Sequence, residues 1–477
     1  MIAEQLKRLA HHSVIYGLGG IVSRVLAVLL LPLYTSYLSP SDYGRIETLV
    51  AGAAVLVILL RMGISSAFFR FYFDSKDRAH RLVVVRTSFW FTIGMATLGL
   101  VVVELLAGSI SSVLFGTDTQ ADLVRAAAVG IWAQMNYEQL TSLFRVEERS
   151  VSFVLASLAN IVITVGATVL LVVALDKGPL GVLVGNFTGT LCVYIVLVAY
   201  RREQLGLQFD RKLLRAMNRF GLPLVPSALA LWVTNFSDRF FLVKLADAHE
   251  VGLYSIGVRI ASAVVLLLTA FRTAWPAFAY SIEDDAEARR TYGFVLTYLI
   301  AVVSWLSLTL GLLAPWIVRL LTTPSFYDGE RVVAPLAFAG AAQAGYVVVA
   351  IGIGRVRRTQ FNWVVTGAAA ALNVVLNLIL IPPYGMMGAA IATVAAYSLM
   401  FLLMAVYAQR IYATPYQWRR VAIALAVAIA LLLAGKLLDA PLPLAIALCA
   451  VYPLALLPLG FYLPAERARL RRLLPSA

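Results

Sequence analysis

Several arginines stand inside apolar stretches of this sequence, where a charge is costly and usually serves a function. Four of them lie deep enough to reach an internal cavity: Arg24, Arg61, Arg259 and Arg272. A guanidinium group keeps its charge and offers a planar fork of donors to phosphate oxygens. The pattern therefore predicts a site that binds an anion within a membrane, and these four residues are its candidates for substrate binding.

Arg24 is the strongest candidate because it lies near the middle of its stretch. Small and polar residues lie within about 40° of it on a helix, namely Ser13, Gly17, Gly20 and Thr35. This stripe is typical of a cavity wall, and the alternative is an arginine paired with a neighbouring helix. For Arg61 the alternative is a side chain that extends to the cytoplasmic surface.

Arg259 and Arg272 fall in one predicted helix, thirteen residues apart. At 100° per residue they point about 140° apart, so a straight helix cannot aim both squarely at one cavity. Arg272 is also close to the predicted cytoplasmic end and is followed by Pro276. We therefore expect Arg259 to contribute more to the cavity than Arg272.

Acidic residues in the apolar stretches are candidates for gating or ion coupling. Asp238 and Arg239 end a predicted helix, and neighbours on a helix diverge by 100°, so they are not expected to pair simply with each other. Each is expected to bond to the other half of the protein and to help close an outer gate; the alternative is an ordinary interface pair. Glu138 either binds a coupling ion or balances an arginine, and a salt bridge is the favoured interpretation.

Signals of other chemistry are missing from the sequence. The four histidines are scattered, and no Gly-rich phosphate loop of the ATPase type is present. Cys192 and Cys449 lie in apolar sequence and are expected to be core residues without a disulfide. We expect no catalytic residues, no metal, no cofactor and no enzymatic activity.

The elements that must position these residues are membrane-spanning helices. Apolar residues make up 61% of the 477, charged residues 13%, and the mean hydropathy is +0.86. Apolar runs of about 18–25 residues have the length of a bilayer-spanning helix. We predict an all-α polytopic membrane protein with about fourteen spans, or twelve as the fallback: 13–36, 46–69, 82–106, 121–144, 151–175, 180–200, 220–243, 252–278, 291–314, 331–353, 361–381, 385–408, 420–437 and 441–462.

Loop charges give the orientation of these spans. Of the 39 Lys and Arg residues, 27 fall in one alternating set of loops and 6 in the opposite set. This bias predicts that both termini lie in the cytoplasm. It also attributes the net charge of +14 to one membrane face, where anionic lipids attract it. Nucleic acid is therefore excluded as a partner.

A basic linker divides the predicted spans into two lobes. We predict an N-terminal lobe at 1–200, an amphipathic cytoplasmic linker at 201–219 whose helix Asp210 caps, and a C-terminal lobe at 220–408. Two additional spans and a basic tail follow at 409–477. A short echo supports a repeat, because DYGRIET at 42–48 and EVGLYSI at 250–256 each open a span.

Two stretches carry a specific resemblance. LPLYTSYLSPSDYGRIETL at 31–49 resembles the first hairpin of bacterial polysaccharide flippases, and GLPLVPSALALWVTNFSDRFFLVKLADAHEVGLYSIGVRIA at 221–261 resembles the start of their second half. These are the O-antigen and exopolysaccharide branch of the multidrug/oligosaccharidyl-lipid/polysaccharide exporter superfamily. The Ser23-Arg24 pair and Arg259 also resemble the related lipid II flippases.

The resemblance implies two six-helix lobes around a central cavity. It implies transport of undecaprenyl-pyrophosphate-linked oligosaccharide from the inner to the outer leaflet, for lipopolysaccharide or exopolysaccharide synthesis. Polysaccharide polymerases or glycosyltransferases would then be partners, and we expect a monomer among membrane lipids. Three alternatives stay open: a lipid II flippase, a multidrug or cation antiporter of the same superfamily, and a membrane glycan polymerase or ligase.

Overall fold

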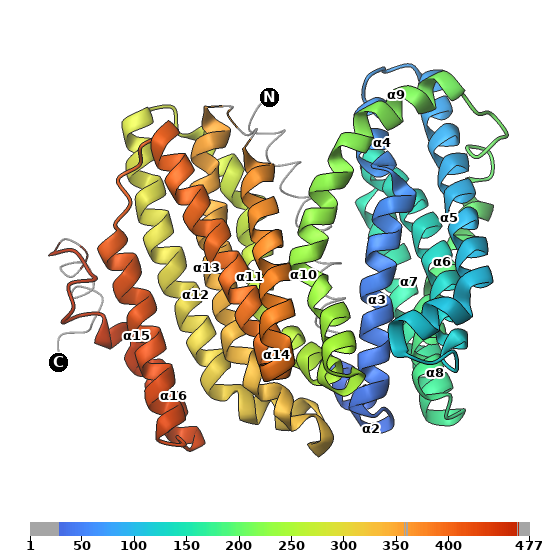
Figure 1. Ribbon diagram of the computed structural model, residues 1–477. Coiled ribbons are helices and arrows are strands. Elements are labelled where there is room, and N and C mark those ends of the chain that lie inside the picture. Colours follow the sequence, from blue (N-terminus) through green and yellow to red (C-terminus); the bar gives the residue numbers. More distant parts are fainter. Residues whose placement is uncertain (1–27, 357, 359–360, 465, 467–477) are drawn as a thin grey trace. The chain divides into compact units, whose positions relative to one another are not determined.

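The computed structural model describes residues 28–356, 358, 361–464 and 466, and every regular element among them is a helix (Figure 1). Ten of these helices are long and apolar enough to cross a bilayer. The all-α, multi-pass prediction is therefore confirmed, with fourteen as an approximate number of spans. The chain divides into two compact units, Met1–Gly252 and Leu253–Ala477.

Unit 1 is built from nine described α-helices. They are α2 (Leu31–Tyr37), α3 (Pro40–Arg61), α4 (Ile64–Tyr72), α5 (Arg78–Phe115), α6 (Ala121–Val146), α7 (Ser150–Val169, continued by the π-helical turn Leu170–Ala174), α8 (Gly178–Arg201), α9 (Arg211–Gly221) and α10 (Val225–Leu245, preceded by the 3-10 turn Leu222–Leu224). Asp210 caps α9, as predicted, because its carboxylate accepts from the Lys212 and Leu213 amides at 2.8 and 3.0 Å.

The prediction of one continuous helix at 46–69 is wrong, because the helix ends at Arg61. Met62 and Gly63 both have positive φ, 49° and 75°, and the chain restarts as α4. A Cβ on Gly63 would lie 2.2 Å from the carbonyl oxygen of Gly221. Only glycine combines that φ with so close an approach of two backbones.

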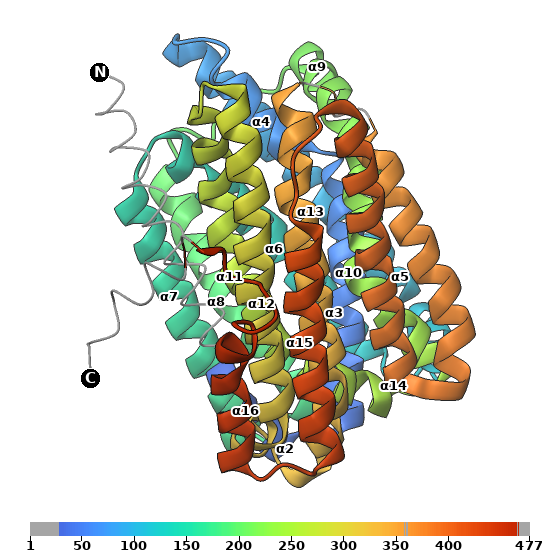
Figure 2. The ribbon, with the colours of Figure 1, turned by 90° about the vertical axis from the view of Figure 1, so that its left-hand side faces the viewer.

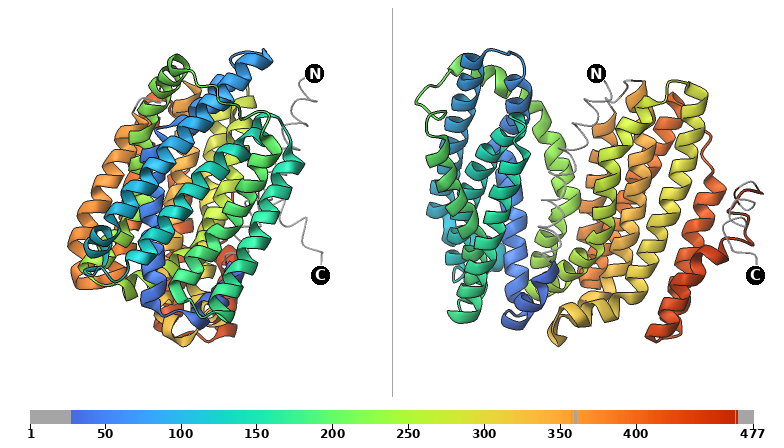
Figure 3. Two further views of the ribbon diagram at one scale, coloured as in Figure 1. Left: turned by 90° about the vertical axis from the view of Figure 1, so that its right-hand side faces the viewer. Right: turned by 180° about the vertical axis from the view of Figure 1, so that it is seen from behind.

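Helices α5, α6, α8 and α7 pack in that spatial order, and Figure 3 shows α7 and α8 side by side in teal and green. Helix α9 lies across the end of unit 1 formed by α4 and α5 (Figure 1). Its Met217 is fully buried in a cluster with Phe68 and Phe144. We call this end, which carries the 73–78, 145–150 and 201–211 loops, the basic end of unit 1.

Helix α10 packs along α3, so unit 1 extends beyond the linker predicted at 201–219. The Trp232 indole donates to the Ala51 carbonyl at 3.0 Å. At the end of α3 away from Gly63, Gly44 lies against the first turn of α11, which begins at Ala248. Helices α3 and α10 thus run together from the Gly63–Gly221 contact toward the opposite end.

Unit 2 contains most of α11 and five further α-helices. They are α11 (Ala248–Ser281), α12 (Asp285–Leu321), α13 (Val333–Arg355, preceded by the 3-10 turn Pro324–Val332), α14 (Asn362–Ile411), α15 (Trp418–Leu437) and α16 (Leu442–Ala455). The spans predicted at 361–381 and 385–408 are two helices of α14 that meet at Gly385, whose φ is 53°. Helices α15 and α16 pack on α12 (Figure 2).

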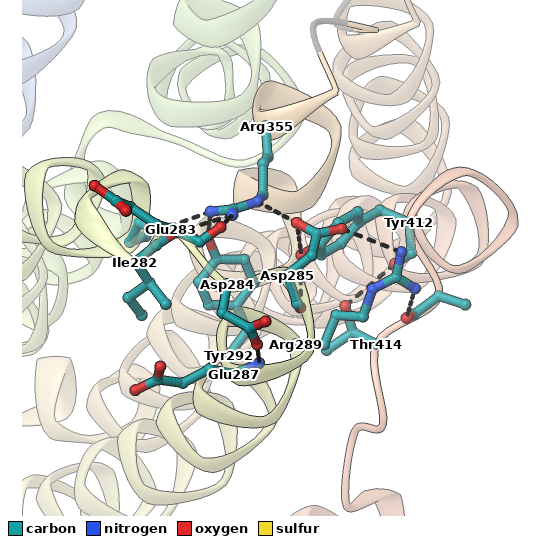
Figure 4. A network of polar contacts seen from close by, with 12 residues as sticks. Ile282, Glu283, Asp284, Asp285, Glu287, Arg289, Tyr292, Arg355, Tyr412 and Thr414 are labelled. Atoms are coloured by element: carbon teal, nitrogen blue, oxygen red, sulfur yellow. Dashed lines mark hydrogen bonds and ion pairs between the residues drawn. The ribbon is translucent and has the colours of Figure 1, made fainter.

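A polar network joins the ends of four helices of unit 2 (Figure 4). Arg355, the last residue of α13, donates to the Asp285 carboxylate at 2.7 Å and to the Ile282 carbonyl at 2.9 Å. The Tyr412 hydroxyl donates to the same carboxylate at 3.1 Å, and Arg289 lies over the Tyr412 ring. Burial and the bond to Asp285 raise the pKa of Tyr412 to about 12, so it remains a donor at physiological pH.

Candidate functional site

Arg61 and Glu138 form an ion pair between α3 and α6. The Arg61 Nη2 atom lies 2.6 Å from Glu138 Oε2, and the two side chains are 18% and 37% exposed. The contact is ionic, because the buried Nη2 atom makes no aligned hydrogen bond with any of the described residues. A guanidinium with unused donors can bind a better-oriented anion by donating hydrogen bonds to it. The predicted salt bridge of Glu138 is therefore present, with Arg61 as the partner.

Helix α6 carries further polar side chains around this pair. The Gln134 amide donates to the other Glu138 oxygen, which leaves Glu138 held from both sides. Gln139, buried one residue along, donates to the Ser88 hydroxyl of α5 at 3.0 Å. Such amides hold membrane helices together. Here the Gln139–Ser88 bond joins α6 to α5, whereas the Gln134–Glu138 bond lies within α6 and orients the Glu138 side chain.

The break in the second span places Arg61 at a helix terminus. Arg61 is the last residue of α3, where the helix dipole stabilises a cation. Non-helical backbone at membrane depth is tolerated where it is covered by protein or lines a cavity. The Met62–Gly63 break is covered on one side by Gly221. The sequence alone signalled neither the break nor this position of the arginine.

Asp238 and Arg239 do pair with each other, contrary to the prediction. Arg239 Nη1 lies 3.2 Å from Asp238 Oδ1, and Arg239 Nε lies 3.7 Å from Glu47 Oε2 of α3. The 100° argument failed because it treats a side chain as a radial rod, whereas the long arginine chain folds back along α10. All three side chains are at most 12% exposed. Their role in gating stays a prediction.

The structure describes two of the three remaining candidate arginines. Arg259 is half-buried and Arg272 exposed on α11, which runs as one helix through both. The predicted angle of about 140° between Arg259 and Arg272 therefore applies to α11. Their roles stay predictions. Arg24 lies outside the described residues.

Some functional candidates were missed or misplaced by the sequence reasoning. Glu47 was not singled out, because the predicted span 46–69 placed it at the start of a helix, whereas α3 begins at Pro40. Cys192 was expected in the core and is exposed on α8, whereas Cys449 is buried as expected. The Cys192 error arose because an apolar face that meets lipid and one that meets protein have the same composition.

Comparison with known proteins identifies a family. The family model for polysaccharide biosynthesis proteins matches residues 36–329, more than half of the chain. The chain is also similar to Lsg locus protein 1 of Haemophilus influenzae, with 23% identity over 317 residues that cover 62% of this chain and 73% of the relative. The resemblance read from residues 31–49 and 221–261 is confirmed by the family match.

Solved structures show which fold the chain shares. The lipid II flippase MurJ in an inward closed conformation superposes with a TM-score of 0.76 at 13% identity, covering 94% of this chain and 98% of MurJ. An inward-facing MATE-family multidrug resistance transporter of the MOP superfamily superposes with a TM-score of 0.69 at 16% identity, covering 84% of this chain and 95% of the transporter. At these identities the likeness concerns the fold. The chain is a multi-pass membrane protein with the MurJ and MATE fold, and it belongs to the family of polysaccharide biosynthesis proteins.

Proposed function

We propose that the protein is a flippase that moves undecaprenyl-pyrophosphate-linked oligosaccharide from the inner to the outer leaflet of a bacterial cytoplasmic membrane. The family match supports a cargo in polysaccharide synthesis, and the fold it shares with MurJ and MATE proteins supports transport by alternating access. The chain acts in this proposal as a transporter and not as an enzyme. Both termini lie in the cytoplasm, in line with the 27-to-6 division of loop cations.

The observation that carries the proposal is the ion pair that Arg61 makes with Glu138. The Arg61 guanidinium lies at a helix break between apolar segments, and within the part of the chain that the structure describes its buried Nη2 has an ionic partner but no aligned hydrogen bond. The Glu138 carboxylate occupies the place that a phosphate oxygen takes when the cargo is bound. A diphosphate oxygen gives the guanidinium a charge-assisted, bidentate partner that Glu138 does not.

The three parts of such a cargo have different requirements. The diphosphate needs fixed cations, which Arg61 and, by sequence, Arg24 and Arg259 supply. The glycan needs polar side chains, of which α6 offers Gln134 beside Glu138. The polyprenyl chain is apolar and remains in the lipid. Only the headgroup therefore needs to be enclosed by the protein.

The membrane potential favours outward movement of this headgroup. The cell interior is negative, and one charge moved through 100 mV is worth about 2.3 kcal/mol. Moving roughly two negative charges outward therefore releases about 4–5 kcal/mol if they cross the whole field. The proposal accordingly requires no coupling ion, and Glu138 serves as the counter-charge of Arg61 in the absence of cargo.

A lipid II flippase is the second candidate, since MurJ shares the fold over 94% of this chain and transport of lipid II would require nearly the same chemistry. The family match favours the polysaccharide cargo. A cation antiporter is disfavoured because Glu138, the acid it would need, is neutralised by Arg61. Polymerases or glycosyltransferases are, in this proposal, partners that supply or consume the glycan, and the flippase works as a monomer.

Proteoliposomes that contain a defined polyprenyl-diphosphate oligosaccharide test the proposal. The measurement is the fraction of headgroups that becomes accessible to an added glycosidase over time. Wild-type protein should expose them, and Arg61→Gln should slow exposure at least tenfold. Arg125→Gln is the matched control, since Arg125 is an exposed α6 arginine paired with Asp122 and Glu104. Exposure no faster than in protein-free liposomes would overturn the proposal.

A further inference from the structure

A second feature of unit 1 is an apolar groove of about 480 Å³ between α7 and α8, with Phe144 of α6 at its base. Its α7 side is formed by residues three or four apart, Ser152, Leu155, Ala159 and Ile163. The α8 side repeats every four residues, with Cys192, Val196 and Tyr200. Alanine and cysteine side chains are small, so the two helices leave a channel where larger side chains would have met.

The groove has the length of one leaflet. From Ser152 to Ile163 the α7 axis rises about 16 Å at 1.5 Å per residue. The hydrocarbon core of a bilayer is about 30 Å thick, so half of it is about 15 Å. The groove starts at the basic end of unit 1, beside Tyr200 and the α6–α7 turn, and it ends near the middle of both helices. One linear hydrocarbon chain of the leaflet at that end fits these dimensions.

An exposed cation, Arg149, stands where the groove opens at the basic end. Arg149 donates to the Tyr200 hydroxyl at 2.8 Å, and its guanidinium lies 5.8 Å from the Tyr200 ring centroid. The same guanidinium lies 6.0 Å from the ring centroid of Phe144 at the base of the groove. Arg149 has no acidic partner within ion-pair distance among the described residues. Glu147 is held by the buried Arg201 at 2.8 Å, so it does not neutralise Arg149.

We infer that this groove binds a glycerophospholipid with an anionic headgroup, with one acyl chain between α7 and α8 and the phosphate at Arg149. The charge of the rim favours an anionic phosphodiester over a zwitterionic one, because a basic residue near the surface attracts anionic lipid. Arg149 offers its remaining guanidinium donors, since among the described residues they make only the bond to Tyr200. The shared helix α6 then connects the lipid site to the cargo site.

The groove and the Arg61 site are separate. Phe144 follows Glu138 by six residues on α6, which turns it about 120° around the helix. The groove therefore lies on a different face of α6 from the ion pair. The lipid site does not depend on the proposed transport function, and the two can fail independently.

Native mass spectrometry of the full-length protein tests the lipid site, with phosphatidylglycerol and phosphatidylcholine titrated separately. Arg149→Gln should weaken phosphatidylglycerol binding about fivefold and leave phosphatidylcholine unchanged. Ala159→Phe fills the groove and should remove the tightest phosphatidylglycerol site. The matched controls are Arg78→Gln, an exposed basic-end arginine, and Val162→Phe, which is 68% exposed on α7 outside the groove. Equal binding of both lipids, or no effect of Arg149→Gln, would overturn the inference.

Cys192 supplies an independent readout because the chain has two cysteines and the other, Cys449, is buried. In a Cys449→Ala background, added phosphatidylglycerol should slow maleimide labelling of Cys192, and Ala159→Phe should abolish that protection. A thiol that is unreactive before lipid is added would mean that another part of the chain fills the groove. Stronger protection by a polyprenyl diphosphate than by phosphatidylglycerol would assign the groove to the cargo instead. Either result contradicts the phospholipid site.

Discussion

Gly44 in α3 and Gly252 in α11 lie backbone to backbone. A Cβ on Gly44 would lie 1.8 Å from the Ala248 carbonyl oxygen and 2.9 Å from the Gly252 nitrogen. A Cβ on Gly252 would lie 2.0 Å from the Pro40 carbonyl oxygen. These glycines are the matching positions of the two echoed segments, DYGRIET and EVGLYSI. The two helices can cross at this distance only if neither position carries a side chain.

Alanine at either position should therefore destabilise the protein. Gly44→Ala and Gly252→Ala force the backbones apart, and overpacking of this kind costs about 1–3 kcal/mol. Thermal unfolding in detergent should show a clear drop in Tm for each. Gly94→Ala and Gly108→Ala are the controls, since nothing lies within 4 Å of a Cβ there and alanine favours the helix. A Gly44→Ala protein that melts like the controls would contradict the close crossing.

The break at Met62–Gly63 should be equally intolerant of a side chain. Gly63 has φ 75° and a backbone neighbour 2.2 Å from its Cβ position, whereas Gly116 has φ 74° and open space. Gly116→Ala should lower the free energy of unfolding by only about 1–2 kcal/mol, the cost of a left-handed alanine. Gly63→Ala should lower the free energy of unfolding by that amount and by about a further 1–3 kcal/mol, because of the clash with Gly221. Equal losses in denaturant unfolding would mean that the Gly63–Gly221 contact relaxes without cost.

How far the sequence predicts this structure depends on the range of the interactions involved. Hydropathy and the IPPYG turn predicted the two helices that meet at Gly385, and Asp210 predicted the cap of α9, because those signals are local. The break after Arg61 was missed because hydropathy stays high across it and the deciding contact is with Gly221. Glu138 was predicted to balance an arginine, but which arginine depends on how α3 packs against α6.

Arg259 should matter more for cargo binding than Arg272. The two residues point about 140° apart on the continuous helix α11, and Arg272 lies nearer the end of α11 that carries Pro276. The dissociation constant of a polyprenyl-diphosphate glycan should rise at least tenfold in Arg259→Ala and about threefold or less in Arg272→Ala, since loss of a charge-assisted bond exceeds loss of a distant charge. Nanodisc binding measurements give both values. A loss confined to Arg272→Ala would reverse the assignment.

Removing the counter-charge of Arg61 should strengthen anion binding. Glu138→Gln keeps the size of the side chain but removes the carboxylate that competes with phosphate. Because the ion pair is partly exposed, it is worth up to about 1 kcal/mol, and the affinity for the anion should therefore rise about fivefold. Calorimetry measures the dissociation constant of inorganic diphosphate for this variant, with Glu104→Gln as the control. Weaker binding in Glu138→Gln would show that Glu138 orients Arg61 rather than competing for it.

The most direct test of the account is the affinity of Arg61 for the diphosphate of the cargo. The dissociation constant of a polyprenyl-diphosphate oligosaccharide is measured in nanodiscs, beside the same glycan on a neutral polyprenyl carrier. The account predicts that the wild type discriminates at least tenfold in favour of the diphosphate, and that Arg61→Gln loses this discrimination while Arg125→Gln retains it. Equal affinity of the wild-type protein for both carriers, or unchanged discrimination in Arg61→Gln, would contradict it.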